Sequence, residues 1–298
     1  MDSDESDFYG DDDLVKDLER KVDNFDVNKW WQAHGALETP LKSQAKGSSL
    51  PIPQYHNPYA GHAYAWQLTE TVDAFLKRLP PATTEQTPGH AWIWICNPYV
   101  KRKSKAEAEN QQIRGGEDEA PEDEGADLAT LIKAGQERLH FASSFIDQFR
   151  QPGLSNSFTL QESKKAGMDA ANDILELAKN LRVTCGKWML FCTVFEVNDV
   201  WEIIAKATVK GELGIAAKVA PRIEGDQRRR ERLICVYTAD FSNIPDVTRV
   251  ARGLKELGLV RRKPLYYKPD AYTYLGIASN NTWGIKASIY DTRSLLGK

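Results

Sequence analysis

The succession of apolar runs between Cys185 and Leu259 constrains the fold of this chain more than any other feature. Each run is short and bounded by polar or glycine residues, and the runs alternate between the patterns of a strand and a helix. The expected order is strand 187–197, helix 199–207, strand 213–219, basic loop 222–232, strand 233–238 and helix 246–257. Gly258 follows as a C-terminal glycine cap. This order predicts an α+β fold with a curved, mainly antiparallel sheet backed by helices.

The remaining elements are predicted from the same two periodicities. Helices are expected at 66–79, 127–149 and 160–181, and strands at 90–96, 272–278 and 283–289. Trp92 and Trp94 alternate with two isoleucines, so the strand 90–96 is apolar on both faces and is predicted to be central in the sheet. Thr159 stands three residues before Glu162, which predicts a capping box. Residues 279–282 are typical of a hairpin turn.

Composition favours one domain with two acidic additions. With 298 residues and 41% hydrophobic content, the chain can bury a sizeable core. We expect residues 1–26 to form an acidic disordered segment with a short amphipathic helix, and residues 27–298 to form a single domain. A charged insertion at about 101–126 is predicted to be a disordered loop. The sequence shows neither a membrane span nor a signal peptide, which favours the cytoplasm, with the nucleus also open.

The sequence also lacks the usual signatures of metal sites and enzymes. The four cysteines form no Cys-x-x-Cys pair, and the five histidines do not fall at zinc-ligand spacing. We therefore expect buried reduced thiols, no metal and no cofactor. Phosphate-binding glycine loops, nucleophile elbows and His-Glu-x-x-His pairs are missing too. A non-enzymatic function is predicted, with an enzyme acting on nucleotides as an alternative whose catalytic groups assemble only in space.

Positive charge gathers in one part of the chain. Residues 205–268 contain fifteen lysines and arginines but only seven acidic residues, although the whole chain carries a net charge of −3. Such clustering is typical of a surface that meets a polyanion. The candidate phosphate-binding residues are Lys218, Arg222, Arg228, Arg229, Arg230, Arg232, Arg262, Lys263 and Lys268.

Aromatic residues are interleaved with the last of these cations. Tyr266, Tyr267 and Tyr272 are candidates for stacking on bases, because rings that alternate with lysines suit single-stranded nucleic acid. Tyr266 and Tyr267 are adjacent and flanked by prolines, which leaves stacking and packing equally open. Tyr272 and Tyr274 are expected to share one face of a strand, where packing is the more common role.

The block 186–259 resembles the cap-binding translation initiation factors of the 4E type. The matching elements are Gly186-Lys187-Trp188, Trp201, Gly214-Ile215-Ala216-Ala217, the basic loop, the strand 233–238 and Leu257-Gly258-Leu259. Trp92-Ile93-Trp94 resembles the first strand of that family. The resemblance implies a curved sheet whose basic concave face holds a nucleotide, with Lys218 and Arg222 near the phosphates. In that family two tryptophans stack on the base, and one of them would be expected between Gln151 and Thr184, where this chain has no tryptophan.

The full chain is closer to the basophilic-leukaemia-expressed protein family, which is understood to share this fold. The residues that carry this resemblance are the stretch 263–276, Lys-Pro-Leu-Tyr-Tyr-Lys-Pro-Asp-Ala-Tyr-Thr-Tyr-Leu-Gly, and Trp283-Gly284-Ile285. It covers roughly residues 60–298.

A short motif near the N-terminus suggests a protein contact. Tyr9, Leu14 and Val15 fit the Tyr, four residues, Leu, apolar pattern of peptides that bind the helical face of cap-binding factors. We hypothesise that this motif docks on its own domain or that the face receives a partner, since an amphipathic helix readily enters an apolar groove.

Taken together, these patterns predict a non-enzymatic protein that binds RNA or a nucleotide through a basic, aromatic concave surface. The main alternative is a protein-interaction module that keeps the fold without a working nucleotide pocket.

Overall fold

The computed structural model describes residues 55–103, 118–149, 156–223 and 231–297, together with three residues of the N-terminal segment. The chain divides into two units, Met1–Ile52 and Pro53–Lys298, and the fold below is that of the second unit. The predicted docking motif of Tyr9, Leu14 and Val15 lies outside the described residues.

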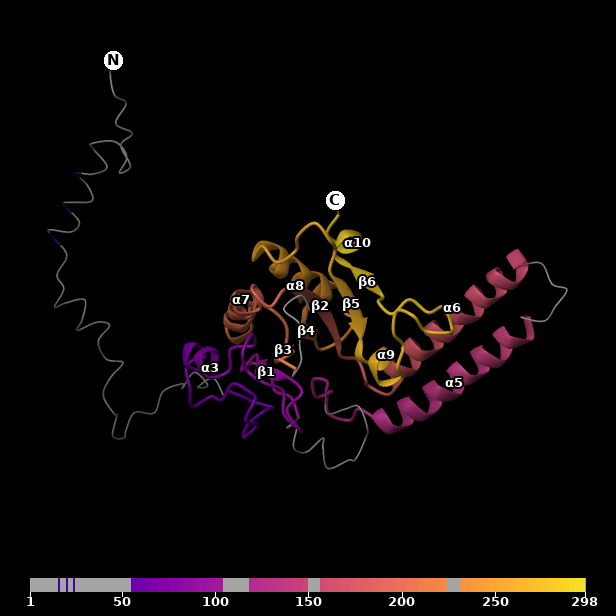
Figure 1. Ribbon diagram of the computed structural model, residues 1–298, viewed down its shortest axis with the longest axis horizontal. Coiled ribbons are helices and arrows are strands. Elements are labelled where there is room, and N and C mark those ends of the chain that lie inside the picture. Colours follow the sequence, from indigo (N-terminus) through magenta and orange to yellow (C-terminus); the bar gives the residue numbers. More distant parts are fainter. Residues whose placement is uncertain are drawn as a thin grey trace, which may run out of the picture. The chain divides into compact units, whose positions relative to one another are not determined.

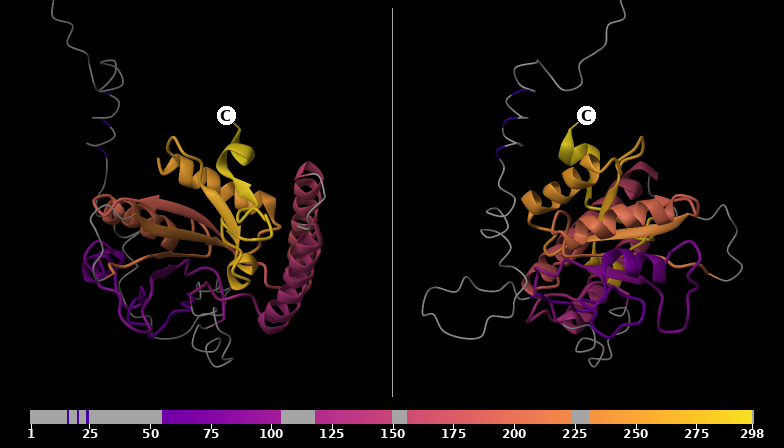
Figure 2. Two further views of the ribbon diagram at one scale, coloured as in Figure 1. Left: turned by 45° about the vertical axis from the view of Figure 1, so that its right-hand side comes forward. Right: turned by 90° about the vertical axis from the view of Figure 1, so that its left-hand side faces the viewer.

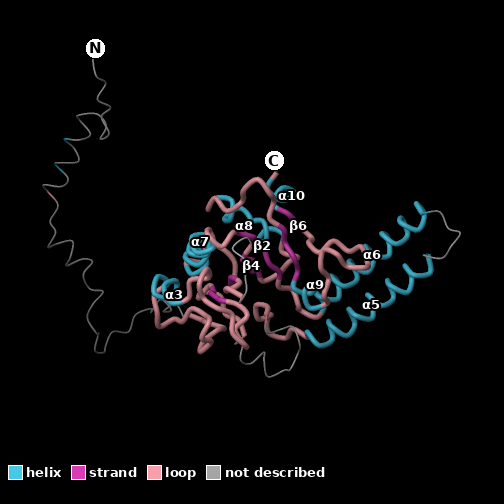
Figure 3. The backbone as a smooth tube through the Cα atoms, viewed as in Figure 1, coloured by secondary structure: helices cyan, strands magenta, loops and turns pink. Residues whose placement is uncertain are grey.

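Six strands form one open sheet in the order β1-β3-β4-β2-β5-β6, and every pair of neighbours is antiparallel (Figures 1 and 3). The strands are β1 (Ile93–Cys96), β2 (Gly186–Cys192), β3 (Ala216–Val219), β4 (Arg232–Thr238), β5 (Tyr266–Pro269) and β6 (Tyr290–Asp291). The α+β class and the antiparallel sheet are thus confirmed.

β1 is buried along its whole length, as its two apolar faces predict, but the prediction of a central position is wrong. β1 lies at one edge of the sheet, beside β3. Its outer edge is covered by residues 64–66, because Trp94 N donates to Tyr64 O at 2.8 Å and Trp66 N donates to Trp94 O at 3.0 Å. The irregular segment therefore supplies the burial that a further strand would give.

The described part of the chain has seven helices: α3 (Val72–Arg78), α5 (Leu128–Phe149), α6 (Asn156–Asn180), α7 (Val197–Val209), α8 (Ile244–Glu256), α9 (Asp270–Tyr274) and α10 (Thr292–Leu296). α7 and α8 cover one face of the sheet (Figure 2). On that face Trp188 Nε1 donates to the carbonyl of Val247 at 3.2 Å. α6 begins before Thr159, so the predicted capping box is wrong. Long helices α5 and α6 pack together as a hairpin (Figure 1).

The predicted C-terminal hairpin of strands 272–278 and 283–289 is also wrong. Strand β5 ends at Pro269, and helix α9 starts at the next residue. Asp270 explains the change, because its backbone N–H donates to Cys185 O and its carboxylate pairs with Lys187. This buried anchor starts a helical turn, and Tyr272 packs inward from α9 rather than from a strand.

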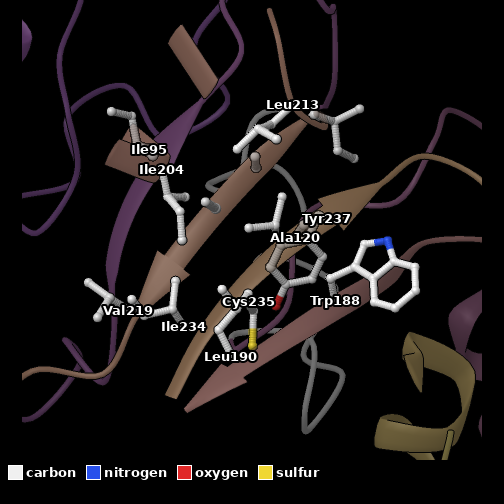
Figure 4. Packing of buried hydrophobic residues seen from close by; sticks show 14 of the residues in the cluster. Ile95, Ala120, Trp188, Leu190, Ile204, Leu213, Val219, Ile234, Cys235 and Tyr237 are labelled. Atoms are coloured by element: carbon white, nitrogen blue, oxygen red, sulfur yellow. The ribbon is translucent and has the colours of Figure 1, made fainter. Parts of the chain in front are cut away.

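Two glycines of the block 186–259 occupy positions where a side chain would be unfavourable. A Cβ at Gly186 would lie 2.4 Å from the hydroxyl of Tyr267, whose ring covers this end of β2. That hydroxyl lies 2.6 Å from Thr238 Oγ1, so the ring is fixed in the core. Gly258, the residue after the C-cap Leu257 of α8, has a φ of 72°, which confirms the predicted glycine cap. Figure 4 shows the surrounding core, in which Trp188 and Tyr237 come from neighbouring strands.

Candidate nucleic-acid interface

A groove of about 780 Å³ lies where β2 extends beyond β5. β5 pairs only with Gly186–Met189, so the last residues of β2 have β4 as their one strand partner among the described residues. The opposite wall is the segment 259–265, between α8 and β5. We call this site the open groove. Its lining includes Met189, Phe191, Arg261, Arg262, Lys263 and Tyr266.

Two aromatic rings of the open groove face solvent. Tyr266 lies opposite Met189 across the strands, and Phe191 lies two residues beyond Met189, so all three share one face of the sheet. Phe191 is 59% exposed and Tyr266 is 48% exposed. Large rings on an uncovered sheet face typically mark a binding surface. Tyr266 was predicted from the sequence, whereas Phe191 was missed.

Basic side chains form the neighbouring wall. Arg262 and Lys263 are exposed, and neither side chain makes an ion pair within the described part of the chain. Arg261 differs, because it donates to Glu196 Oε1 at 2.5 Å. The groove therefore combines available cations with available ring faces, which is the combination that single-stranded nucleic acid requires.

A second set of cations lies further along the same face and is fully covered. Lys187 stands opposite Tyr237 in the register, and Lys218 stands opposite Cys235 one strand further. Both lysines pair with the carboxylate of Glu119, with Lys218 Nζ at 3.2 Å from Oε1. Tyr237 also donates its hydroxyl to Glu119 Oε2 at 2.5 Å. We call these four residues the covered lysine cluster.

Three further contacts complete the cluster. Lys187 Nζ lies 2.8 Å from Asp270 Oδ1 and donates to Thr273 Oγ1 at 3.1 Å. Lys218 Nζ lies 4.0 Å from the centroid of the Trp92 ring, close enough for a cation–π interaction. Each ammonium is therefore satisfied without water, as a buried charge must be.

The electrostatics of the cluster follow from burial and proximity. Burial opposes the ionisation of Glu119, but Lys218 and Lys187 outweigh it, and the pKa falls to about 2. Burial lowers the pKa of Lys187, but Asp270 and Glu119 more than reverse this, and the pKa rises. Burial raises the pKa of Asp270 to about 6, despite the opposing effect of Lys187. At neutral pH the cluster is held together by opposite charges.

Glu119 belongs to a segment that we call the strap, residues 118–122. The acidic insertion 101–126 was predicted to be a disordered loop, but at this end of it Glu119 and Ala120 are buried. Figure 4 draws Ala120 together with the sheet residues of the core, including Tyr237. The strap gains its order from ion pairs to the sheet, which a local reading of an acidic stretch does not reveal.

The other predicted phosphate-binding residues have varied surroundings. Lys218 is buried in the cluster, and Arg232 is buried on β4. Lys268 is partly buried opposite Lys187, and burial followed by the charge of Lys187 lowers its pKa. Arg222 is half exposed, with Nη1 3.9 Å from Glu85 Oε1. Arg228, Arg229 and Arg230 lie outside the described residues.

Two of the three stacking candidates belong to the core. Tyr267 is buried against Trp188 and Gly186, and Tyr272 is buried beneath α6. In this structure neither presents a ring face to solvent, so the open groove keeps Tyr266 alone of the three. Tyr266 and Tyr267 can be told apart by alternation along β5, which points their side chains to opposite faces of the sheet.

Glu122, Cys185 and Asp270 form the one group of potential metal ligands found in the described part of the chain, with ligand atoms within 4.8 Å of one another. Cations already contact two of them, since Arg102 Nη2 lies 2.8 Å from Cys185 Sγ and Lys187 pairs with Asp270. We therefore assign no metal here.

All four cysteines are free and buried, which confirms the predicted thiols. Among the described residues, no helix has the length and apolarity needed to cross a membrane.

The fold and the site define a class: an α+β protein with an open antiparallel sheet and a basic, aromatic groove where β2 extends beyond β5. The family can also be stated. A family model for the basophilic leukemia-expressed protein Bles03 matches residues 18–276, and the chain belongs to this family.

Proposed function

We propose that this protein binds RNA or a nucleotide-containing ligand without catalysing a reaction on it, and that the open groove is the binding surface. One observation carries the proposal: two exposed rings, Phe191 and Tyr266, stand beside two exposed cations, Arg262 and Lys263, that have no ion pair among the described residues. Bases stack on such rings while phosphates meet the cations. The ligand is therefore expected to have at least one unpaired base and one phosphate.

We also propose that the fold is of the cap-binding initiation factor type. The order of strands and helices from Gly186 to Leu259 and the packing of α7 and α8 against the sheet support this relationship. Selective recognition of a methylated cap is not part of the proposal, because the resemblance supplies no second stacking tryptophan. A short single-stranded RNA is the probe that the groove favours.

The test is a titration of a fluorescently labelled single-stranded RNA, followed by anisotropy at several salt concentrations. Binding by the wild-type protein is expected to weaken steeply with salt, as counterions are released from each phosphate contact. The double variant Arg262→Ala/Lys263→Ala should lose most of this affinity. The matched control is Lys133→Ala/Lys165→Ala, which removes the same charge from exposed positions of α5 and α6. Equal affinities of the two double variants would contradict the proposal.

A protein-interaction role is the second candidate, and the α5–α6 hairpin favours it. Phe141 on α5 is 67% exposed and Met168 on α6 is 58% exposed. Exposed apolar side chains on helices suit a protein partner. If this role is the correct one, Phe141→Ala/Met168→Ala should abolish partner binding while the protein shows no affinity for RNA.

A further inference from the structure

The carboxylate of Glu119 fills a site that has the chemistry of a phosphate-binding pocket. Three donors from three adjacent strands converge on it: the ammonium groups of Lys187 and Lys218 and the hydroxyl of Tyr237. All three side chains are at least nine-tenths buried. A phosphate group accepts hydrogen bonds from the same donors, with more oxygens and more negative charge than a carboxylate.

The occupant comes from the strap and not from the sheet. Asp118 and Glu119 contact Lys218 through a backbone carbonyl and a carboxylate, and Asp118 Oδ1 also accepts from Trp92 Nε1 at 3.1 Å. The sequence separations of 68 and 99 residues from Glu119 to the two lysines show that this anion is brought in from a distant segment. The lysines would keep their places on β2 and β3 if the strap moved away.

The other end of the strap is held less favourably. Glu122 Oε2 accepts backbone N–H groups of Thr184 and Cys185 at 3.1 and 3.0 Å. Glu122 Oε1 and Asp270 Oδ2, however, are buried without a hydrogen-bond partner, and the two carboxyl groups approach within 4.8 Å. Burial, and then the charge of Asp270, raises the pKa of Glu122 to about 8. The strap thus combines a favourable contact at Glu119 with an unfavourable one at Glu122.

We propose that the strap is an intramolecular competitor for a phosphate-bearing ligand, and that its displacement lets Lys187, Lys218 and Tyr237 take a phosphate in place of Glu119. This inference rests on the proposed function, since it extends the open groove inward along the same sheet face. An opened strap without ligand would leave two buried ammonium groups short of a partner, which is strongly unfavourable. Opening is therefore coupled to ligand binding, and the strap sets the apparent affinity.

The first test measures the binding of inorganic pyrophosphate by calorimetry to the full chain and to Glu119→Gln. Loss of the carboxylate charge should release the strap and tighten pyrophosphate binding by about tenfold, within the usual range of coupling between sites. Glu124→Gln is the matched control, because it makes the same change at an exposed position two residues beyond the strap. Unchanged or weaker binding by a folded Glu119→Gln protein would overturn the inference.

Strap release has an independent optical readout. The fluorescence of Trp92 is isolated by subtracting the spectrum of Trp92→Phe. Its quenching by acrylamide should increase when Asp118 no longer contacts the indole. Pyrophosphate should cause this change in the wild-type protein, and Glu119→Gln should show it in part without ligand. Pyrophosphate binding that leaves Trp92 unchanged would place the anion elsewhere and overturn the inference.

A second variant, Glu122→Gln, should weaken pyrophosphate binding where Glu119→Gln strengthens it. It therefore tests the inference even if Glu119→Gln fails to fold. Glu122 faces Asp270 and Tyr274 of α9, Cys185 before β2 and Arg102 after β1. At pH 9 the wild-type Glu122 is mostly ionised, and the strap should open more easily. Glu122→Gln cannot ionise, so its affinity for pyrophosphate at pH 9 should be lower than that of the wild-type protein. A higher affinity for Glu122→Gln would contradict the inference.

These outcomes separate the inference from the proposed function. If RNA binding depends on Arg262 and Lys263 but Glu119→Gln gains nothing, the competitor role fails and the proposed function stands. If pyrophosphate binding responds to Glu119→Gln but no RNA binds to any variant, the anion site stands and the RNA proposal fails.

Discussion

The exposed rings of the open groove and the covered lysine cluster lie on one face of one sheet, yet positive charge has opposite surroundings in the two regions. In the groove, Arg262 and Lys263 extend into solvent, whereas Lys187 and Lys218 are buried against Glu119. The difference shows that a lysine in a basic stretch is available to a ligand only where the chain supplies no anion of its own. Charge counts along a sequence cannot make this distinction.

The largest expected effect is a difference in the free energy of unfolding between variants of the covered lysine cluster and variants of the open groove. Lys187→Met would leave the carboxylates of Glu119 and Asp270 buried beside each other, and removal of one member of a buried ion network costs about 3–5 kcal/mol. Lys263→Ala in the open groove should change the free energy of unfolding by less than about 0.5 kcal/mol. Urea unfolding of both variants measures the contrast. Similar losses in the two variants would mean that the cluster is not held by its charges.

Aromatic stacking should give the next largest effect, and only in the groove. Tyr266→Ala should weaken RNA binding by about 1–3 kcal/mol, the contribution of one stacked base. Tyr266→Phe keeps the ring and should bind nearly as well as the wild-type protein. Tyr99→Ala is the control, because Tyr99 is also exposed, at 56%, but does not line the groove. A Tyr99→Ala loss as large as that of Tyr266→Ala would show that stacking is not localised in the groove.

The pH dependence of stability should report on the strap. The pKa of Glu122 is about 8 in the folded protein and 4.5 in its usual state, so the folded protein holds a proton that the unfolded chain has released. Stability should therefore fall as pH rises from about 4.5 to 8, by at most about 1.4 kcal/mol per pH unit. Asp270, whose pKa rises from 3.8 to about 6, acts in the same direction at lower pH.

Glu122→Gln sharpens this prediction. The variant should flatten the pH profile between 6 and 8, while Glu124→Gln should keep the wild-type profile. Thermal unfolding across this range makes the measurement. A wild-type profile that is flat, or that rises with pH, would contradict the assignment of a protonated Glu122.

The smallest expected effect concerns salt. Each phosphate contact on a single strand contributes about 0.7 to the slope of log affinity against log salt. Lys263→Ala should lower this slope by about that amount, whereas Lys268→Ala should lower it less, because Lys268 is partly buried opposite Lys187. Anisotropy titrations at four or more salt concentrations resolve the difference. An equal or larger change for Lys268→Ala would extend the binding surface toward the cluster.

The strand and helix order from Gly186 to Leu259 could be predicted because each element there has its own local signal. Short apolar runs bounded by polar or glycine residues predicted β2 and β4, and Gly258 caps α8 as expected. The same reasoning failed at 270–274, where two tyrosines in alternate positions suggested a strand. Pro269 and the buried pair of Asp270 with Lys187 override that local preference and start α9.

The candidate site was predictable only in part, for a physical reason. Arg262, Lys263 and Tyr266 were found because exposed cations and rings cluster locally in the sequence. Phe191 could have been found from its alternation with Met189 along β2. Glu119 could not have been found, because its role in the site depends on ion pairs with lysines that are far away in the sequence.

The most direct test of the central claim is a zero-length ultraviolet cross-link between a short single-stranded RNA and the wild-type protein, located by mass spectrometry. Rings that stack on bases are the groups placed to cross-link. We predict cross-links on the peptides that contain Phe191 and Tyr266, with loss of the second in Tyr266→Ala. Cross-links confined to the α5–α6 hairpin would contradict the claim that the open groove receives the ligand.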